Sequence, residues 1–144
     1  MKKFYKKIFK RNDNNELILF STSKHTEKNI EELAITDIPM PHLRWHPFRN
    51  EWVAYSQGRE KRIAFPPQEY CPFCPSGSLE YPTEIPFKNF EVVAFPNRWS
   101  SFITNKKNII SLPGIKTKSS DGYCEVIVYS SNHNDTVADM SLEK

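Results

Sequence analysis

Two cysteines three positions apart, in the segment Cys71-Pro-Phe-Cys74, constrain this chain more than any other feature of its sequence. The intervening proline and phenylalanine let both sulfurs point to the same side of a turn, so the pair can bind one soft or borderline metal ion. Zinc is the default ion for such a pair, and it normally takes four ligands. His133 is the only histidine after Cys74, so the sequence offers a third ligand and no fourth.

The composition predicts one globular domain with a real core. The chain has 144 residues, of which 38% are hydrophobic and 13% aromatic. It contains no apolar run near the ~18 residues that a membrane span requires, and its first ten residues lack the apolar segment of a signal peptide. Two of its three cysteines lie in one metal-binding motif, which fits a reducing compartment. We therefore expect a cytoplasmic protein without a membrane segment.

The net charge of +3 is unevenly distributed along the chain. Residues 1–30 hold eight Lys/Arg and three Asp/Glu, or +5, which leaves 12 against 14, or −2, for residues 31–144. A nucleic-acid surface needs a basic face on the folded body, so we expect no nucleic-acid partner. Residues 1–40 are predicted to form a basic N-terminal arm, either a solvated edge or a contact for an anionic partner, and residues 41–144 the main domain.

Alternating hydrophobic residues and turn residues predict a sheet-rich chain. A hairpin is expected from residues 4–9 and 16–20, a strand at 51–56 after a turn at 47–50, and further strands at 90–95, 108–112 and 123–129. A short helix around Ile30, an irregular loop at 71–87 and a turn region at 114–122 complete the pattern. Residues 139–144 are typical of a helix start. Because a sheet needs a covering layer, we expect a fragment truncated before its covering helix.

Two further segments carry residues suited to an anionic ligand. Three cations follow Gly58 in Arg59-Glu-Lys-Arg62, and their side chains can bind phosphate or form a solvated loop. Asn97, Arg98 and Trp99 directly follow a predicted strand, where an amide, a guanidinium and an indole can hold a nucleotide, although Trp99 can equally be a core aromatic. Cys124, within the strand predicted at 123–129, is expected to be a small buried side chain and not a ligand.

Five motifs taken in order resemble the galactose-1-phosphate uridylyltransferase family over about residues 40–144. They are Arg44-Trp-His-Pro-Phe-Arg-Asn-Glu-Trp-Val53, Ser56-Gln-Gly-Arg-Glu-Lys-Arg62, Cys71-Pro-Phe-Cys74, Val93-Ala-Phe-Pro-Asn-Arg-Trp-Ser-Ser-Phe102 and Cys124-Glu-Val-Ile-Val-Tyr-Ser-Ser-Asn-His133. The resemblance implies an α+β, histidine-triad-like fold with an antiparallel sheet, built from two related halves and forming a homodimer. It also implies UDP-glucose, UDP-galactose and hexose 1-phosphates as substrates, with transfer through a uridylyl-histidine intermediate.

The resemblance assigns roles to individual residues. It places Cys71, Cys74 and His133 at a zinc site, and Arg59, Arg62 and Asn97 at the UDP-sugar site. Arg98 and Trp99 occupy the next two positions, where some members carry Asp and Phe. The family's nucleophile lies in a His-Pro-His motif that these 144 residues lack. We therefore expect no catalytic residue here and no activity from this chain alone.

Two alternatives remain open from the sequence. The chain can be a small zinc-binding interaction module, which predicts a closed shell of four ligands within the 144 residues. It can also belong to a nucleotide phosphorylase of the same superfamily that acts on adenylyl groups. The residues that select the base are not recognisable in the sequence.

Overall fold

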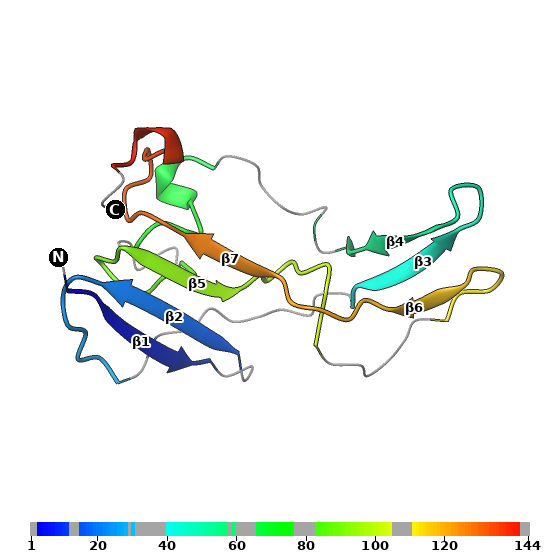
Figure 1. The fold of residues 1–144 in the computed structure, drawn as a ribbon, viewed down its shortest axis with the longest axis horizontal. Coiled ribbons are helices and arrows are strands. Elements are labelled where there is room, and N and C mark those ends of the chain that lie inside the picture. The colour runs from blue at the N-terminus through cyan, green and yellow to red at the C-terminus, as the bar shows by residue number, and fades with distance from the viewer. Residues whose placement is uncertain are drawn as a thin grey trace. The chain divides into compact units, whose positions relative to one another are not determined.

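The computed structural model describes residues 3–11, 15–28, 30, 40–57, 59, 66–76, 83–104 and 111–141. The chain divides into two compact units. The first comprises Met1–Ala34, Ala64–Phe95 and Val126–Lys144, and the second comprises Ile35–Ile63 and Pro96–Glu125. Each unit contains one sheet (Figure 1). The predicted boundary between residues 40 and 41 stays a prediction.

The first unit contains a four-stranded sheet in the order β1-β2-β5-β7. Its strands are β1 (Tyr5–Lys10), β2 (Glu16–Ser21), β5 (Val92–Pro96) and β7 (Glu125–Val128). β1 pairs with β2 and β2 with β5, both antiparallel. The predicted N-terminal hairpin is confirmed, and the backbone N–H of Arg11 closes its turn by donating to the carbonyl of Asn15 at 2.8 Å.

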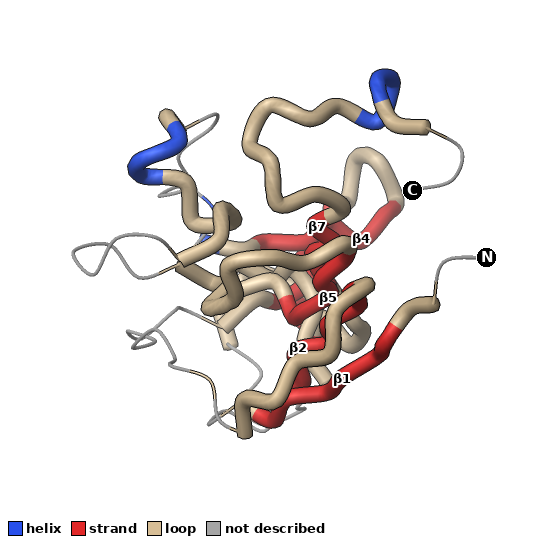
Figure 2. Tube along the Cα trace, turned by 90° about the vertical axis from the view of Figure 1, so that its left-hand side faces the viewer, coloured by secondary structure: helices blue, strands red, loops and turns tan. Residues whose placement is uncertain are grey.

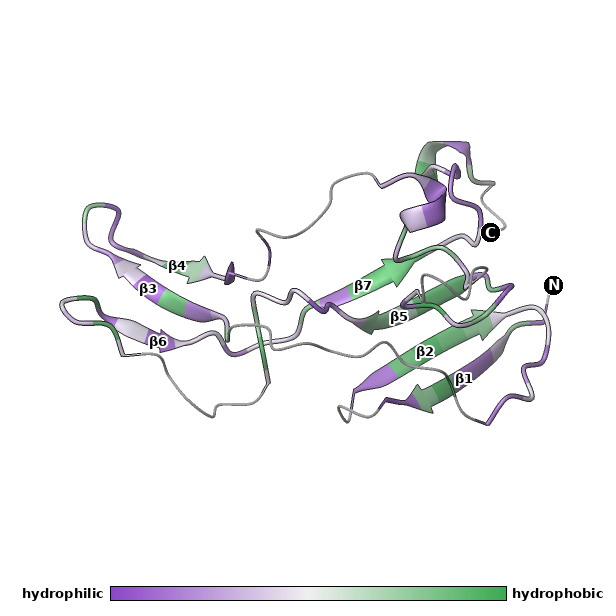
Figure 3. Ribbon diagram, turned by 180° about the vertical axis from the view of Figure 1, so that it is seen from behind, coloured by the Kyte–Doolittle hydropathy of each residue, from purple (hydrophilic) through white to green (hydrophobic). Residues whose placement is uncertain are grey.

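The core of this unit lies on one face of the sheet, because alternate residues of each strand point the same way. Phe9 pairs with Leu17 and Leu19 with Val93, and all four side chains are buried. Figure 3 shows hydrophobic residues along β2, β5 and β7, with alternating polar positions on β1. Phe95 and the loop residues Ile85, Phe87 and Phe90 complete the buried cluster.

The loop between η2 and β5 covers this core without regular structure over its described parts, as the four prolines of the segment predict. η2 (Gln68–Tyr70) is a short 3-10 helix directly before the first cysteine. Ile85 forms a bridge with Pro75, and the ring of Phe87 packs 4.9 Å from that of Phe9, measured between centroids. The described parts of the loop are therefore held by contacts with the core.

The second unit contains a three-stranded antiparallel sheet in the order β4-β3-β6. Its strands are β3 (His42–His46), β4 (Glu51–Tyr55) and β6 (Thr117–Ser119). The predicted turn and following strand are confirmed by the hairpin of β3 and β4, whose turn ends at Asn50 with φ 53°. Asparagine tolerates this left-handed conformation better than most residues.

Three expectations about secondary structure and one about burial need correction. β6 lies inside residues 114–122, which were predicted to be turns, and it forms because its backbone pairs with β3. The strands predicted at 90–95 and 123–129 are shorter or shifted, and occupy 92–96 and 125–128. Cys124 is half-buried, not buried.

Helix is scarce in the structure. The helical residues that the structure describes are all in short 3-10 segments, namely η2, η3 (Val137–Asp139) and the residues Gln57 and Arg59. Figure 2 shows these short helical segments among strands and loops. Most of the predicted helix around Ile30 and most of the strand predicted at 108–112 lie outside the described residues. The same holds for the last three residues of the helix start predicted at 139–144. Among the described residues, no helix combines the length and apolar character needed to cross a membrane. The structure thus shows mostly antiparallel sheet, as predicted.

Candidate metal centre and substrate-binding segments

The two cysteines of the motif lie on a turn that follows η2. The backbone N–H of Cys71 donates to the carbonyl of Gln68 at 3.2 Å, and that of Cys74 donates to the carbonyl of Cys71 at 3.4 Å. Phe73, between them, packs against the core, with its ring centroid 6.0 Å from that of Phe95. Phe73 therefore attaches the turn to the core of the unit.

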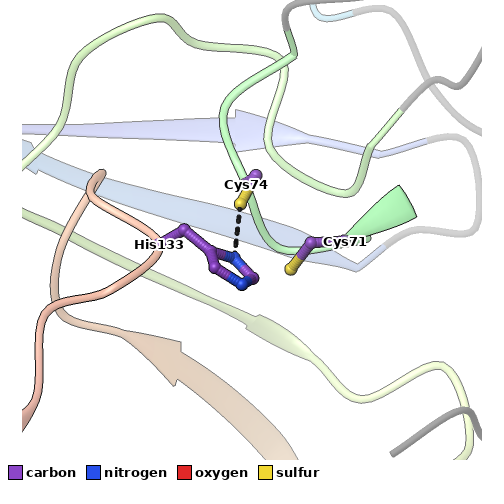
Figure 4. Close-up of side chains that lie close together, drawn as sticks. All are labelled: Cys71, Cys74 and His133. Carbon is purple, nitrogen blue, oxygen red and sulfur yellow. Dashed lines mark hydrogen bonds between the residues drawn. The ribbon is translucent and has the colours of Figure 1, made fainter. Parts of the chain in front are cut away.

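His133 meets this turn from a distant part of the sequence. The Sγ atoms of Cys71 and Cys74 and an imidazole nitrogen of His133 all lie within 4.8 Å of one another. The Sγ of Cys74 is 3.2 Å from Nδ1 of His133 (Figure 4). All three residues belong to the first unit and are half-buried. The structure therefore brings together the three residues that the sequence predicts as metal ligands.

The three donor atoms lie close enough together to be ligands of one tetrahedral zinc ion. Zn–S bonds of about 2.3 Å and Zn–N bonds of about 2.0 Å put neighbouring ligand atoms roughly 3.5–3.8 Å apart. Burial, followed by the effects of the neighbouring Cys71 thiol, raises the pKa of the Cys74 thiol to about 11. A bound metal ion would counteract this rise in pKa, because metal ions bind the deprotonated thiolate. The described residues supply three ligands, so the fourth position must be filled by water or by another residue.

The turn that carries His133 is held by one carboxylate. Asp135 accepts hydrogen bonds from the hydroxyl of Ser130 at 2.5 Å and from the side-chain amide of Asn132 at 2.7 Å. The backbone N–H of Asn132 also donates to the Ser130 hydroxyl at 3.1 Å. These bonds fix the backbone on both sides of His133, so its ring is held in place without a helix or a strand.

A buried ion pair that the sequence analysis missed lies next to the cysteine turn. Nη2 of Arg11 is 2.9 Å from Oε2 of Glu84, and the side chains are 7% and 3% exposed. The burial of Arg11 could have been inferred from its position, because Arg11 lies two residues after Phe9 and four after Lys7, on the inward-facing side of β1. A cation at such a position needs a buried partner. No local pattern identifies Glu84, which is 73 residues away.

Arg59 contacts the segment after β5 within the second unit. Its Nη1 donates to the hydroxyl of Ser101 at 2.9 Å, and the Ser56 hydroxyl donates to the carbonyl of Ser100 at 3.0 Å. The structure therefore joins Ser56 and Arg59, a predicted substrate-binding residue, to the two serines that directly follow the predicted segment Asn97–Trp99. Arg62 lies outside the described residues.

Asn97, Arg98 and Trp99 form a half-buried turn in the same unit. The side-chain oxygen of Asn97 accepts from the backbone N–H of Trp99 at 3.0 Å, and the Asn97 N–H donates to the carbonyl of Cys124 at 2.8 Å. The Arg98 guanidinium lies 5.8 Å from the centroid of the Trp99 ring. These hydrogen bonds use the side-chain oxygen and the backbone N–H of Asn97 and leave its side-chain N–H₂ unused.

The structure defines a class of sheet-rich protein. Its members would combine antiparallel sheets with a Cys/Cys/His cluster and with an arginine and an asparagine suited to an anionic ligand. The chain belongs to the family described as "Galactose-1-phosphate uridyl transferase, N-terminal domain", which matches residues 23–144. A galactose-1-phosphate uridylyltransferase of Thermotoga maritima is 35% identical over 107 residues, which cover 73% of this chain and 32% of that protein. The chain thus spans about a third of this relative's length. No solved structure matches it significantly.

Proposed function

We propose that this chain is the metal-binding and part of the substrate-binding portion of a nucleotidyltransferase that moves a uridylyl group between UDP-glucose and galactose 1-phosphate. The membership of the family and the name of the Thermotoga maritima relative support the reaction class. The observation that carries the proposal is the convergence of Cys71, Cys74 and His133 within 4.8 Å, because the family resemblance assigns these same residues to one site.

Zinc is the ion that we propose for this site. Cys71, Cys74 and His133 would hold it, and bound zinc would act structurally by cross-linking the cysteine turn to the turn after β7. An interaction module with a closed shell of four ligands is less well supported, because the described residues group only three. The α+β, histidine-triad-like fold, the homodimer and the cytoplasmic location belong to the same proposal and rest on the family resemblance.

The arginine and asparagine of the second unit are proposed to bind the UDP-sugar. Arg59 is exposed and is oriented by Ser101, so its remaining donors can reach a phosphate oxygen. Asn97 is held by its own turn, which leaves its side-chain N–H₂ available to the ligand. Arg62, Arg98 and Trp99 are proposed to complete this site by charge and stacking.

The transfer requires a nucleophilic histidine, and none of the histidines in these 144 residues is assigned that role. In the proposed reaction, an imidazole nitrogen bonds to the α-phosphorus of UDP-glucose while the bond to the oxygen of glucose 1-phosphate breaks. Galactose 1-phosphate then accepts the uridylyl group from the nitrogen. Cations such as Arg59 would stabilise the charge that develops on the phosphate oxygens. None of the four histidines has a second histidine two residues away, so we expect the 144 residues alone to be inactive.

Ligand binding tests this proposal directly. We expect calorimetric titration of the chain to show tighter binding of UDP-glucose than of ADP-glucose. Arg59→Met should weaken UDP-glucose binding about tenfold or more, because it removes a charge-assisted contact to phosphate. Arg49→Met is the matched control, since Arg49 is 68% exposed and pairs only with Glu51 among the described contacts. Tighter binding of ADP-glucose would favour the adenylyl-specific phosphorylase. Exchange of label between UDP-glucose and glucose 1-phosphate by residues 1–144 would refute the claim that these residues lack the nucleophile.

A further inference from the structure

The N-terminal hairpin contributes a buried arginine to the loop behind the metal centre. Arg11 follows β1 and lies outside residues 23–144, which match the family. Its backbone is fixed by the hydrogen bond to Asn15 that closes the hairpin, and its guanidinium donates to Glu84 at 2.9 Å. The two side chains are almost fully buried, so the contact is protected from the screening that weakens surface pairs.

Glu84 connects this arginine to the cysteine turn. The backbone N–H of Glu84 donates to the carbonyl of Pro72, between the two cysteines, at 2.8 Å. One residue further on, the carbonyl of Ile85 accepts from the N–H of Ser76 at 2.9 Å. The segment 83–85 therefore lies against the cysteine turn along its backbone, while the Glu84 side chain is held by the hairpin. All of these residues belong to the first unit.

We propose that Arg11 and Glu84 are positioning residues for the metal centre, through which the N-terminal hairpin holds the cysteine turn in the conformation that binds metal. This inference rests on the proposed metal site at Cys71, Cys74 and His133. A turn without helix or strand has few contacts of its own to fix two sulfurs, so a buried ion pair on the supporting segment sets how long the metal is retained. Residues that orient metal ligands indirectly typically change metal affinity 10- to 100-fold when replaced.

The test compares two variants of the full chain, Arg11→Met and the double variant Arg11→Met/Glu84→Met. The single variant leaves a buried carboxylate without this partner and is expected to be less stable, whereas replacing both members by apolar side chains is often neutral for folding. Zinc transfer to a chelator should be about tenfold faster in both variants. The visible spectrum of the cobalt-loaded protein should also change. Arg49→Met, at an exposed pair, is expected to match the unmodified chain.

The double variant separates positioning from stability. If it unfolds at the same urea concentration as the unmodified chain and still releases zinc faster, the pair positions the cysteine turn. If it is folded and releases zinc at the unmodified rate, or if neither variant folds, the proposal is overturned because the pair then serves folding alone. An unmodified chain that binds no zinc or cobalt refutes the metal site itself. In that case the hydrogen-exchange rate of the Glu84 amide still tests whether Arg11 holds the segment 83–85 against the cysteine turn. An unchanged rate in Arg11→Met overturns this role of Arg11.

Discussion

Phe73 connects the cysteine turn to the core, and its removal is the most informative single change. The ring packs against the buried cluster beside Phe95, at a centroid separation of 6.0 Å. Truncation of a fully buried phenylalanine to alanine costs about 3–5 kcal/mol. Phe73 is half-buried, so we expect Phe73→Ala to lower the free energy of unfolding by about 2 kcal/mol, including a contribution from the aromatic pair. This is a large share of the roughly 5–15 kcal/mol that stabilises a typical domain.

The same change should weaken metal binding. A loss of about 2 kcal/mol corresponds to roughly a 30-fold shift between the docked and undocked turn. We expect zinc affinity to fall by at most about 30-fold. The apparent affinity is reduced by the fraction of chains whose turn is undocked, and that fraction cannot change by more than the docking equilibrium does. Urea titration of the metal-free chain measures the first effect, and competition with a chromophoric chelator measures the second. Phe73→Leu should retain most of both, since it keeps an apolar group of similar size.

Phe48→Ala is the matched control, because this ring is 96% exposed at the turn between β3 and β4. Its free energy of unfolding should stay within about 0.5 kcal/mol of the unmodified value. A Phe73→Ala chain that unfolds and binds zinc like the Phe48→Ala chain would refute the reasoning, since the turn would then be held independently of the core.

Three further outcomes are expected. Metal analysis should find one zinc per chain, retained in Cys124→Ser but lost in Cys74→Ser and His133→Ala, and equal retention in all three would contradict the site. Because the pKa of the Cys74 thiol is raised to about 11, a metal ion must displace a proton from it. Zinc affinity, measured by chelator competition, should therefore rise with pH between about 6.5 and 8.5, and an affinity independent of pH would argue against thiolate ligation. At a free zinc concentration of about 100 times Kd, the free energy of unfolding should exceed that of the chelated protein by about 2.7 kcal/mol, with no difference in Cys74→Ser.

Local patterns in the sequence predict the fold where a segment is rich in hydrophobic residues and bounded by turn residues. Residues 4–9 and 16–20 meet both conditions, and the hairpin is found where expected. β6 does not, because Thr117-Lys-Ser119 lacks hydrophobic residues and becomes a strand only by pairing with β3. β3, in contrast, begins directly after Pro41 and alternates polar with apolar residues from His42 to His46, which is a strand signal in the sequence that was not used.

The candidate site was predictable in its residues but not in its support. The two cysteines three positions apart indicate a metal ligand pair, and the family resemblance adds His133. Nothing in the local sequence joins Arg11 to Glu84 or Ser56 to the carbonyl of Ser100, because these contacts depend on how distant segments pack. The inward-facing position of Arg11 is the one feature that could have indicated a buried partner.

The separation of the ligands along the chain has a consequence for biosynthesis. His133 follows Cys74 by 59 residues. At about 5–20 residues per second, a ribosome needs roughly 3–12 s to synthesise this interval. If the three residues bind zinc as proposed, the two thiols exist for seconds before the histidine is synthesised, and during that time they are open to oxidation or to another soft metal. Under this proposal the three-ligand site is complete only late in synthesis.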